Sequence, residues 1–499
     1  MNRLMKTSNK TKILFPALIA GLGFLLADCV TAQTTAQTIT VLLNLGGDGT
    51  HPFSGLVLSG SSLYGTAFEG GPYGWGTIFV ASTTSGNSSI VEFPVLNQGA
   101  SPRSGLVLSG STLYGTTSGL GGYDYGTVFA ATTEGGFTNL YSFSALESGT
   151  NGDGAYPYSS LVLAGNILYG TTFNGGSSGN GTVFAVATDG SFFTNIYSFT
   201  ALVSGTNSDG ANGYGGLVLA GDTLYGTAVN GGSSGSGTIF SLNTNGSSFT
   251  NLYSFSALVS GTNSDGAVPG VTLLLSGSTL YGAAYNGGSS GNGTIFAVNT
   301  NGTGFTNLHN FAASVGTAGI YGFGTNSEGA HPQATSGLEL SGSTLYGTTE
   351  FGGIAGNGAV FQIQTNGTQF SSLWNFSATD ANGYNADGAL PCGGVTLSGN
   401  TLYGTTYDGG SSGDGTVFSL TPMSLDIAQA GTNMIFTWPT NVFLTIPTNA
   451  SGFTLQSSTN LGASAAWITI SSSSAVVNGR NMVTLPISSV QQFFRLHEN

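Results

Sequence analysis

The sequence has few charged side chains, and very few of them are positive. Only 6% of its 499 residues are charged, and no lysine follows Lys12. Beyond residue 32 the positive charge comes from Arg103, Arg480 and Arg495 alone, against twenty acidic side chains. A surface without a basic stripe cannot neutralise phosphates, so nucleic acid is excluded as a partner. Schiff-base chemistry on a lysine is excluded for the same part of the chain.

Cysteine and long apolar segments are also scarce. Cys29 and Cys392 are the only cysteines, and Cys392 alone remains if residues 1–32 are cleaved, so we expect that disulfide bonds do not hold the fold together. Residues 1–32 have the pattern of a signal peptide: a basic start, an apolar run over residues 13–27, and Val30-Thr31-Ala32 before the expected cleavage. A lipoprotein acylated at Cys29 is the alternative. No later apolar run approaches the roughly 20 residues of a membrane helix, and we predict an exported protein that is periplasmic, extracellular or on the cell surface.

Glycine, by contrast, is abundant, with 83 residues, but it has no collagen-like period. A Leu-Tyr-Gly triplet instead recurs at intervals of 50 to 65 residues. Each copy carries four short apolar segments in a fixed order, separated by Gly, Asn and Ser clusters. In the fourth copy these segments are 216–219, 223–227, 237–240 and 249–255. The tyrosines of the triplets are Tyr64, Tyr114, Tyr169, Tyr225, Tyr281, Tyr346 and Tyr403.

Four strands in each of seven units is the pattern of an all-β, seven-bladed β-propeller, which we predict for residues 33–422. The seventh unit stops at Pro422 without a fourth strand. A strand-like segment, Ile39–Leu45, precedes the first unit, and we expect it to close the ring by completing the last blade. A parallel β-helix is the alternative, because glycine and asparagine are common in that fold.

These units resemble a known family. Leu-Tyr-Gly-Thr-Thr, Gly-Gly and Gly-Thr-Val-Phe are similar to the repeats of the GloVer (Gloeo-Verruco) family of exported bacterial proteins, over about residues 39–422. Ala283 and Ala284 replace the Thr pair in the fifth unit, and Ala359 replaces the Thr of Gly-Thr-Val-Phe in the sixth. The resemblance implies no activity and no catalytic residues, because none is assigned to the family.

The period ends after Pro422, and residues 423–499 have a different pattern. Alternating runs such as 434–438, 453–456 and 467–470 predict a small β-sandwich. Its ending, Phe494-Arg495-Leu496, resembles that of C-terminal modules on exported proteins of the same bacterial groups.

Two sets of long loops should lie on one face of the propeller: the loop between the second and third strands of each blade (the second loop) and the loop that crosses to the next blade (the crossing loop). The crossing loops share an acid-Gly pair, with Gln98 at the acid position of the second unit. Asp before Gly is typical of turns, in which the carboxylate caps backbone N–H groups. Calcium binding is the alternative, and we expect no other cofactor. The turn acids are Asp48, Asp153, Asp209, Asp265, Glu328 and Asp387.

Catalytic patterns are not evident. His309 occupies a strand position that other units fill with tyrosine, and His51 and His331 occupy one variable loop slot. No third ligand accompanies them, so no metal site is predicted. No serine lies in a Gly-x-Ser-x-Gly segment that follows a strand and precedes a helix, and Cys392 has no evident histidine partner. We therefore expect a protein that is not an enzyme.

The second loops of the first two units differ from the repeated Asn-Gly-Gly-Ser-Ser-Gly text. Their aromatic and acidic side chains would suit a sugar or peptide, since flat apolar faces stand beside polar groups; packing of the loops on each other is the alternative. We predict a binding or surface scaffold for an extracellular polysaccharide or protein. The other hypotheses are a polysaccharide hydrolase or lyase that uses loop-face carboxylates, and a purely structural surface protein. The candidate ligand-binding residues are Glu69, Tyr73, Trp75, Tyr123, Asp124 and Tyr125.

Overall fold

The computed structural model describes two compact units: residues 39–419, and the two chain ends, 1–38 with 420–499. All of its regular elements are β-strands. The residues that the structure describes are 15–17, 38–47, 49–83, 88–92, 99–333, 337–421, 426–430, 433–439, 453–458, 468–470, 475–477, 480–486 and 492–498.

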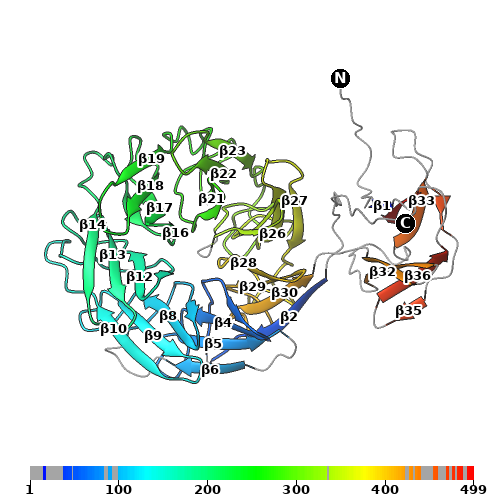
Figure 1. Ribbon diagram of the computed structural model, residues 1–499, viewed down its shortest axis with the longest axis horizontal. Helices are drawn as coiled ribbons and strands as arrows, with labels where there is room; N and C mark the ends of the chain where they lie inside the picture. The colour runs from blue at the N-terminus through cyan, green and yellow to red at the C-terminus, as the bar shows by residue number, and fades with distance from the viewer. Residues whose placement is uncertain are drawn as a thin grey trace. The chain divides into compact units, whose positions relative to one another are not determined.

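Seven antiparallel sheets follow one another around a ring, each with its first strand innermost, which confirms the predicted seven-bladed β-propeller (Figure 1). The first three blades consist of β3 (Val57–Ser59), β4 (Ser62–Ala67), β5 (Thr77–Ser82) and β6 (Ser88–Glu92); β7 (Val107–Ser109), β8 (Thr112–Thr117), β9 (Thr127–Thr132) and β10 (Phe137–Ser142); and β11 (Val162–Ala164), β12 (Ile167–Thr171), β13 (Thr182–Ala187) and β14 (Phe193–Ser198).

The next three blades repeat this order, and blade four carries an extra short strand, β15 (Ala211–Gly213), beside β17. Their strands are β16 (Val218–Ala220), β17 (Thr223–Asn230), β18 (Thr238–Asn243) and β19 (Thr250–Ser254); β20 (Leu274–Ser276), β21 (Thr279–Ala284), β22 (Thr294–Asn299) and β23 (Thr306–Asn310); and β24 (Glu339–Ser341), β25 (Thr344–Thr349), β26 (Ala359–Gln364) and β27 (Ser371–Asn375).

The seventh sheet joins the two ends of the repeat region. Its strands β28 (Val395–Ser398), β29 (Thr401–Thr406) and β30 (Thr416–Thr421) are followed on the outside by β2 (Thr38–Asn44). The Leu45 amide donates to the Gly415 carbonyl at 3.0 Å. Leu45 also packs in one buried cluster with Val417 of blade seven and Leu63 and Phe79 of blade one.

The Leu-Tyr-Gly triplet is explained by packing inside a blade. Leu224 is fully buried, and Gly226 faces the ring of Phe240 on the next strand. A Cβ at Gly226 would lie 2.6 Å from that ring, and at the equivalent glycines of the other blades 2.4–2.6 Å from the equivalent phenylalanines. Only glycine leaves room for the phenylalanine of the Gly-Thr-Val-Phe segment, so the two motifs fit one another.

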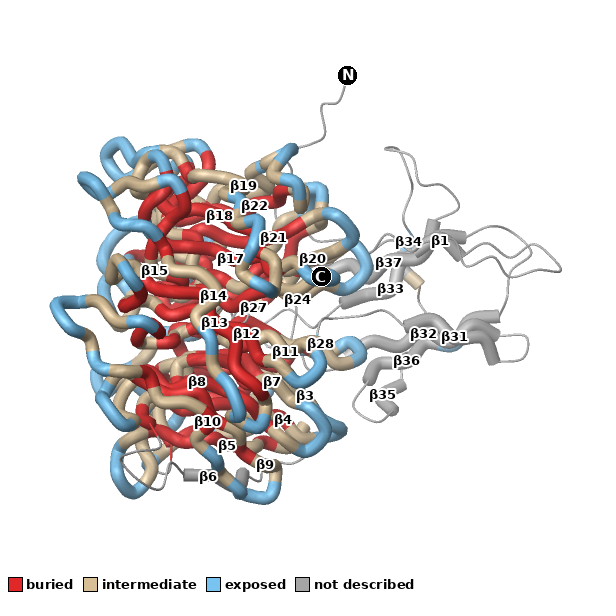
Figure 2. Tube along the Cα trace, turned by 60° about the vertical axis from the view of Figure 1, so that its left-hand side comes forward, coloured by how far each residue is buried: buried red, intermediate tan, exposed pale blue. Residues whose placement is uncertain are grey.

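The joints between blades repeat as well. The glycine of Gly-Thr-Val-Phe contacts the crossing-loop proline of the next blade, as Gly76 contacts Pro102, and an added Cβ there would lie 2.6 Å from the proline ring. Blade four has Gly213 in place of the proline. Buried residues run along the strands of the propeller, with exposed residues at the loops (Figure 2).

The second unit contains two four-stranded sheets. The chain segment 15–17, inside the predicted signal peptide, forms the edge strand β1 beside β37. No helix in the described ranges is long and apolar enough to span a membrane. One sheet consists of β1 (Phe15–Ala17), β37 (Gln492–Glu498), β33 (Phe453–Ser458) and β34 (Ile468–Thr469), and the other of β31 (Asp426–Ala430), β32 (Asn433–Pro439), β36 (Arg480–Pro486) and β35 (Ala475–Val477).

Candidate functional site

The crossing loops and the second loops meet on one face of the propeller. Antiparallel bridges join each crossing loop to the second loop of the blade that it enters, as Ala155 pairs with Asn174 in blade three. The same bridge joins Thr50 to Glu69, Ala100 to Gly119, Ala267 to Asn286, Ala330 to Phe351 and Ala389 to Asp408. Side chains on both sets of loops therefore share one surface, which we call the loop face.

The candidate aromatics of blade one form a stacked pair on the loop face. The rings of Tyr73 and Trp75 lie 5.0 Å apart at an angle of 21°. Tyr73 is 58% exposed, so the outer side of the pair is open to solvent. Glu69 is also exposed, 3.9 Å from the imidazole of His51.

The candidate residues of blade two are arranged differently. Tyr123 is 59% exposed, and Asp124 is exposed in a left-handed backbone conformation. Tyr125 is partly buried, and its ring packs edge-on against Tyr156 of blade three at 5.5 Å. Among the described rings no contact joins this loop to Trp75, so the two loops do not form one continuous aromatic surface.

The turn acids hold the outermost strands. Asp209 is buried and accepts hydrogen bonds from the Tyr197 hydroxyl at 2.7 Å and the Thr200 amide at 2.9 Å. The same arrangement recurs, with a tryptophan or histidine in place of the tyrosine in two blades. The pairs are Asp153 with Tyr141, Asp265 with Tyr253, Asp387 with Trp374 and Glu328 with His309. Asp48 and Gln98 lie outside the described residues.

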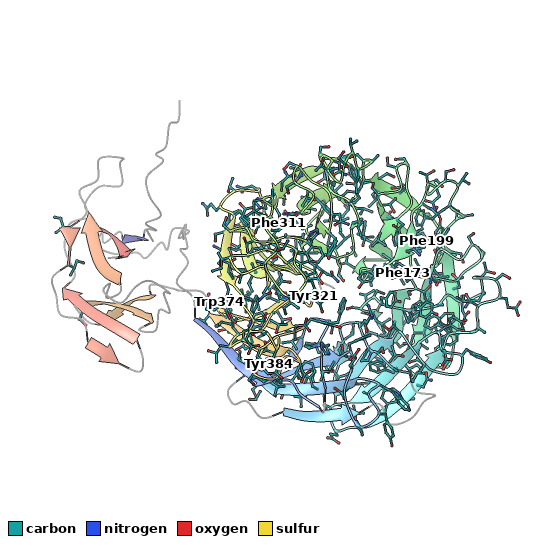
Figure 3. All side chains as sticks on the ribbon, turned by 180° about the vertical axis from the view of Figure 1, so that it is seen from behind. Phe173, Phe199, Phe311, Tyr321, Trp374 and Tyr384 are labelled. Atoms are coloured by element: carbon teal, nitrogen blue, oxygen red, sulfur yellow. The ribbon has the colours of Figure 1, made fainter. Side chains whose placement is uncertain are left out.

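A cluster that the sequence analysis missed lies where the loop face meets the axis. Two positions in each blade supply it: the fifth residue after the turn acid and the fourth after the triplet tyrosine. Figure 3 shows Phe173, from one of these positions, and Tyr321, from an extended crossing loop, toward the centre of the ring. We call these residues the axial positions: Phe53, Arg103, Tyr158, Tyr214, Gly270, Gln333 and Cys392, with Phe68, Ser118, Phe173, Val229, Tyr285, Glu350 and Tyr407.

Carboxylates on one side of the axis have raised pKa values. The Tyr285 hydroxyl donates to Glu350 at 2.9 Å, and Tyr285 packs in one cluster with the buried Cys392. Burial raises the pKa of Glu350 to about 7 despite the hydrogen bond from Tyr285. Burial also raises the pKa of the Cys392 thiol, and a protonated thiol is a poor nucleophile.

Asp408 stands beside this group at the end of the second strand of blade seven. It accepts a hydrogen bond from Tyr321 at 3.2 Å and lies 3.4 Å from His51 Nε2. Burial raises the pKa of Asp408, while His51 acts in the opposite direction. His331 occupies the same slot as His51 in another blade, where its Nδ1 lies 3.1 Å from the Tyr285 carbonyl oxygen.

Arg103 lies among aromatic rings of neighbouring blades. Its guanidinium carbon is 4.4 Å from the centre of the Phe68 ring and 5.4 Å from the centres of the Phe53 and Tyr158 rings. These distances are in the range of cation–π interactions. Sequence reasoning could have found Arg103 by aligning the fifth residue after each turn acid.

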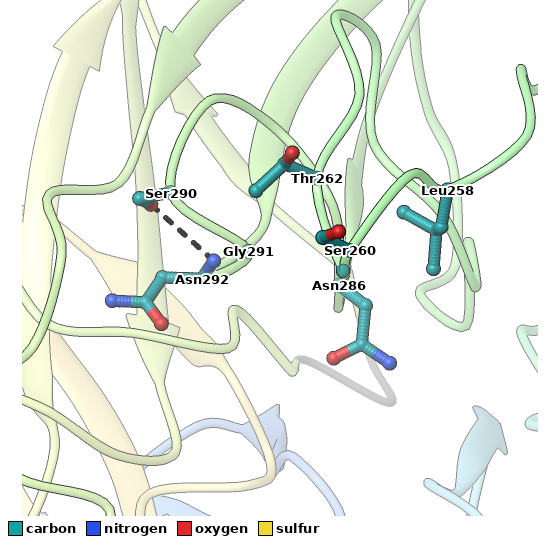
Figure 4. Close-up of a pocket in the computed structure, with 8 residues that line it drawn as sticks. Leu258, Ser260, Thr262, Asn286, Ser290, Gly291 and Asn292 are labelled. Atoms are coloured by element: carbon teal, nitrogen blue, oxygen red, sulfur yellow. Dashed lines mark hydrogen bonds between the residues drawn. The ribbon is translucent and has the colours of Figure 1, made fainter.

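A shallow hollow of about 390 Å³ lies elsewhere on the loop face, in blade five (Figure 4). Leu258, Ser260 and Thr262 of a crossing loop line it together with Asn286 and Asn292 of a second loop. All of its lining residues are uncharged and belong to loops whose sequence is repeated in other blades. Within the described parts of the chain, no three His, Cys, Asp or Glu side chains are grouped to hold a metal ion.

No curated protein matches the chain. Several solved structures are similar to it. One is an oligogalacturonate lyase in complex with manganese (11% identity, 83% of this chain and 98% of that chain covered, TM-score 0.46). Another is the oligogalacturonate lyase of Vibrio parahaemolyticus (10% identity, 82% of this chain and 97% of that chain covered, TM-score 0.47). A third is a puromycin-hydrolyzing peptidase of Mycobacterium tuberculosis (10% identity, 82% of this chain and 62% of that chain covered, TM-score 0.44). Likeness at this level says nothing about activity.

The family comparison is more specific. The model of the Gloeobacter/Verrucomicrobia repeat matches residues 29–205 and 198–322. These ranges contain five of the seven Leu-Tyr-Gly triplets. The chain therefore belongs to the Gloeobacter/Verrucomicrobia repeat family, as the motifs of its sequence predict.

Proposed function

We propose that the chain is an exported, non-enzymatic binding protein whose loop face binds a carbohydrate or another extracellular polymer. The observation that carries this proposal is the stacked pair of Tyr73 and Trp75, which is open to solvent. The pair lies in a second loop whose sequence differs from the repeated Asn-Gly-Gly-Ser-Ser-Gly sequence. Flat apolar rings bind sugar faces through burial of apolar area. Glu69 on the same loop is exposed and adds a polar group to this surface.

Binding requires a rigid platform, and we infer that the ring is closed by β2. The position of β2 beside β30 and the cluster of Leu45 with Leu63 and Phe79 support closure. The two four-stranded sheets of the second unit likewise support a β-sandwich at residues 423–499. If residues 1–32 are removed on export, β1 is lost and β37 keeps β33 as its partner.

A glycan array tests the proposal, probed with the full mature chain and with a Tyr73→Ala/Trp75→Ala double variant. We expect the double variant to bind about tenfold more weakly, because the apolar platform is gone, while its melting temperature stays within a few degrees of the parent. Phe192→Ala is the matched control, since this ring is 41% exposed in the turn between β13 and β14, on the face opposite the loop face. Unchanged binding by the double variant would refute the site, and an array without hits would favour a purely structural surface protein.

The second candidate is an enzyme on polysaccharide, favoured by one observation. Glu350 has a pKa near 7, as a general acid requires, and Asp408 is a second carboxylate beside it in the cluster. Incubation of the protein with polysaccharides, followed by an assay for new reducing ends or unsaturated products, would detect a hydrolase or a lyase. Turnover that Glu350→Gln abolishes would support this candidate over the binding protein.

A further inference from the structure

We propose that Arg103 and the tyrosines next to it form a second binding site, at the axis of the propeller, for a small hydroxylated carboxylate. Sugar acids and hydroxy acids share this chemistry. The site lies at axial positions of blades two, three and four, apart from the stacked pair of blade one. The choice of a sugar acid as ligand makes the proposed carbohydrate binding more specific and rests on that proposal. The expected contact with a carboxylate depends on Arg103 alone.

The first argument concerns the hydrogen-bond acceptors of Arg103, whose side chain is partly buried. Its guanidinium forms no ion pair with any residue that the structure describes. Its Nε is buried and has no hydrogen-bond partner there. The three neighbouring rings interact with the charge but cannot accept its N–H groups in the plane of the fork. A buried N–H group is normally hydrogen-bonded, because an unpaired one loses its hydration without compensation.

The second argument concerns what would supply the acceptors. A planar guanidinium binds a carboxylate through two parallel hydrogen bonds, the geometry for which arginine is preferred over lysine. Arg103 is the one arginine of the propeller unit, and that unit has no lysine. An anion that binds to the propeller therefore has Arg103 as its single permanently charged cationic partner.

The third argument concerns the hydroxyl groups and the net charge of the ligand. The Tyr158 and Tyr214 rings lie 5.6 Å apart, and neither hydroxyl is hydrogen-bonded to a described residue. Burial raises the pKa of the Tyr214 phenol, whereas the charge of Arg103 acts in the opposite direction. Two phenol hydroxyls beside a cation match a ligand with hydroxyl groups next to its carboxylate. The acids Glu350 and Asp408 favour a singly charged ligand over a dianion, which they would repel more strongly.

Titration calorimetry on the full mature chain tests the site, with sodium glucuronate, sodium lactate and uncharged glucose as probes. We expect glucuronate to bind and glucose to fail, because glucose lacks the carboxylate. Lactate separates the two sources of the ligand: binding as tight as that of glucuronate assigns the site to small hydroxy acids, and weaker binding assigns it to sugar acids. The proposal is wrong if neither acid binds.

Two further measurements identify Arg103 as the contact. Arg103→Gln should weaken glucuronate binding by about tenfold or more, because a charge-assisted pair is lost, whereas Tyr73→Ala/Trp75→Ala should leave it unchanged. In the unaltered protein, raising sodium chloride from about 0.05 M to about 0.5 M should weaken the binding severalfold through screening. Binding that does not respond to salt would overturn the proposal even if the Arg103 variant does not fold. Binding at the stacked pair of Tyr73 and Trp75 is expected to be insensitive to salt. The two proposed sites can therefore be tested separately, and a negative result for one does not refute the other.

Discussion

The framework of the propeller and its axial positions differ in how much they vary between blades. The triplet leucine, the triplet glycine and the facing phenylalanine are the same in all seven blades, and the glycine faces the phenylalanine in each of them. The fifth residue after the turn acid belongs to six different types in the seven blades. Positions with identical surroundings are held constant by packing, whereas positions that converge on the axis each meet a different neighbour. Specialisation in this chain is therefore to be sought at the axis and in the loops that depart from the repeat.

Removing one strand should disturb the framework most. Deletion of residues 39–45 would leave β30 as an unpaired edge and remove Leu45 from its cluster with blade one. We expect a loss of several kcal/mol or aggregation, because an exposed strand edge templates pairing with other chains. Thermal melting and light scattering measure both effects. A chain shortened only by residues 33–37 is the control, and a deletion that melts like the parent would refute closure by this strand.

A single added side chain should cost somewhat less. Gly226→Val would place Cβ 2.6 Å from the Phe240 ring in the fully buried interior of blade four. We expect the free energy of unfolding to fall by about 3 kcal/mol, since a packed core does not relax enough to admit the new atoms. Denaturant titration measures the change. Gly152→Ala is the control, because nothing lies within 4 Å of its added Cβ; equal losses in both variants would contradict the packing explanation.

Loss of one turn-acid contact should have a smaller effect. Tyr197→Phe removes the hydroxyl that donates to buried Asp209 at 2.7 Å. We expect a loss of about 2 kcal/mol, as for a hydrogen bond to a charged acceptor. Tyr225→Phe in the next blade is the matched control: its hydroxyl has no hydrogen bond to any described residue, and its removal should change stability little. If both variants melt alike, Asp209 does not depend on this contact.

Replacing Glu350 should change how the melting temperature depends on pH more than it changes the stability at any one pH. The pKa of Glu350 is raised to about 7 in the folded protein, so the folded state binds more protons than the unfolded state between about pH 4.5 and 7. Stability that Glu350 contributes at low pH is therefore lost as pH rises through this window. Melting temperatures across the window should fall less steeply in Glu350→Gln than in the parent. Parallel profiles would show that Glu350 titrates normally.

The repeat fold could be predicted from sequence because each motif has one structural role. Leu-Tyr-Gly and the segment equivalent to Gly-Thr-Val-Phe occur in every unit and lie on paired strands in every blade. The number of repeats in the sequence therefore predicted the number of blades correctly. The hydrogen-bonding pair of His309 and Glu328 was not predicted, although both departures from the repeat, His in place of Tyr and Glu in place of Asp, are visible in the sequence. Imidazole is shorter than phenol, and the longer carboxylate of Glu328 still reaches it at 3.2 Å.

The axial cluster could not be predicted by the search for local motifs. Arg103 meets Phe68 and Tyr158 only because three consecutive blades converge, and these residues are separated by 35 and 55 positions in the chain. Nothing in the sequence around Arg103 marks it as different from a turn residue. The raised pKa of Glu350 likewise depends on burial by other blades. Properties created by convergence of distant segments need the three-dimensional arrangement.

The repeated joint between blades has a consequence for the history of the gene. The contact of Gly76 with Pro102 recurs, with other residues, at five further joints of the ring. A duplication or loss of one whole unit would therefore create or remove a joint of the same chemistry, and β2 would meet an equivalent partner strand. Recombination between neighbouring copies meets no barrier at the joints themselves. The number of copies is restrained instead by geometry, because only certain numbers of blades close a ring without a gap.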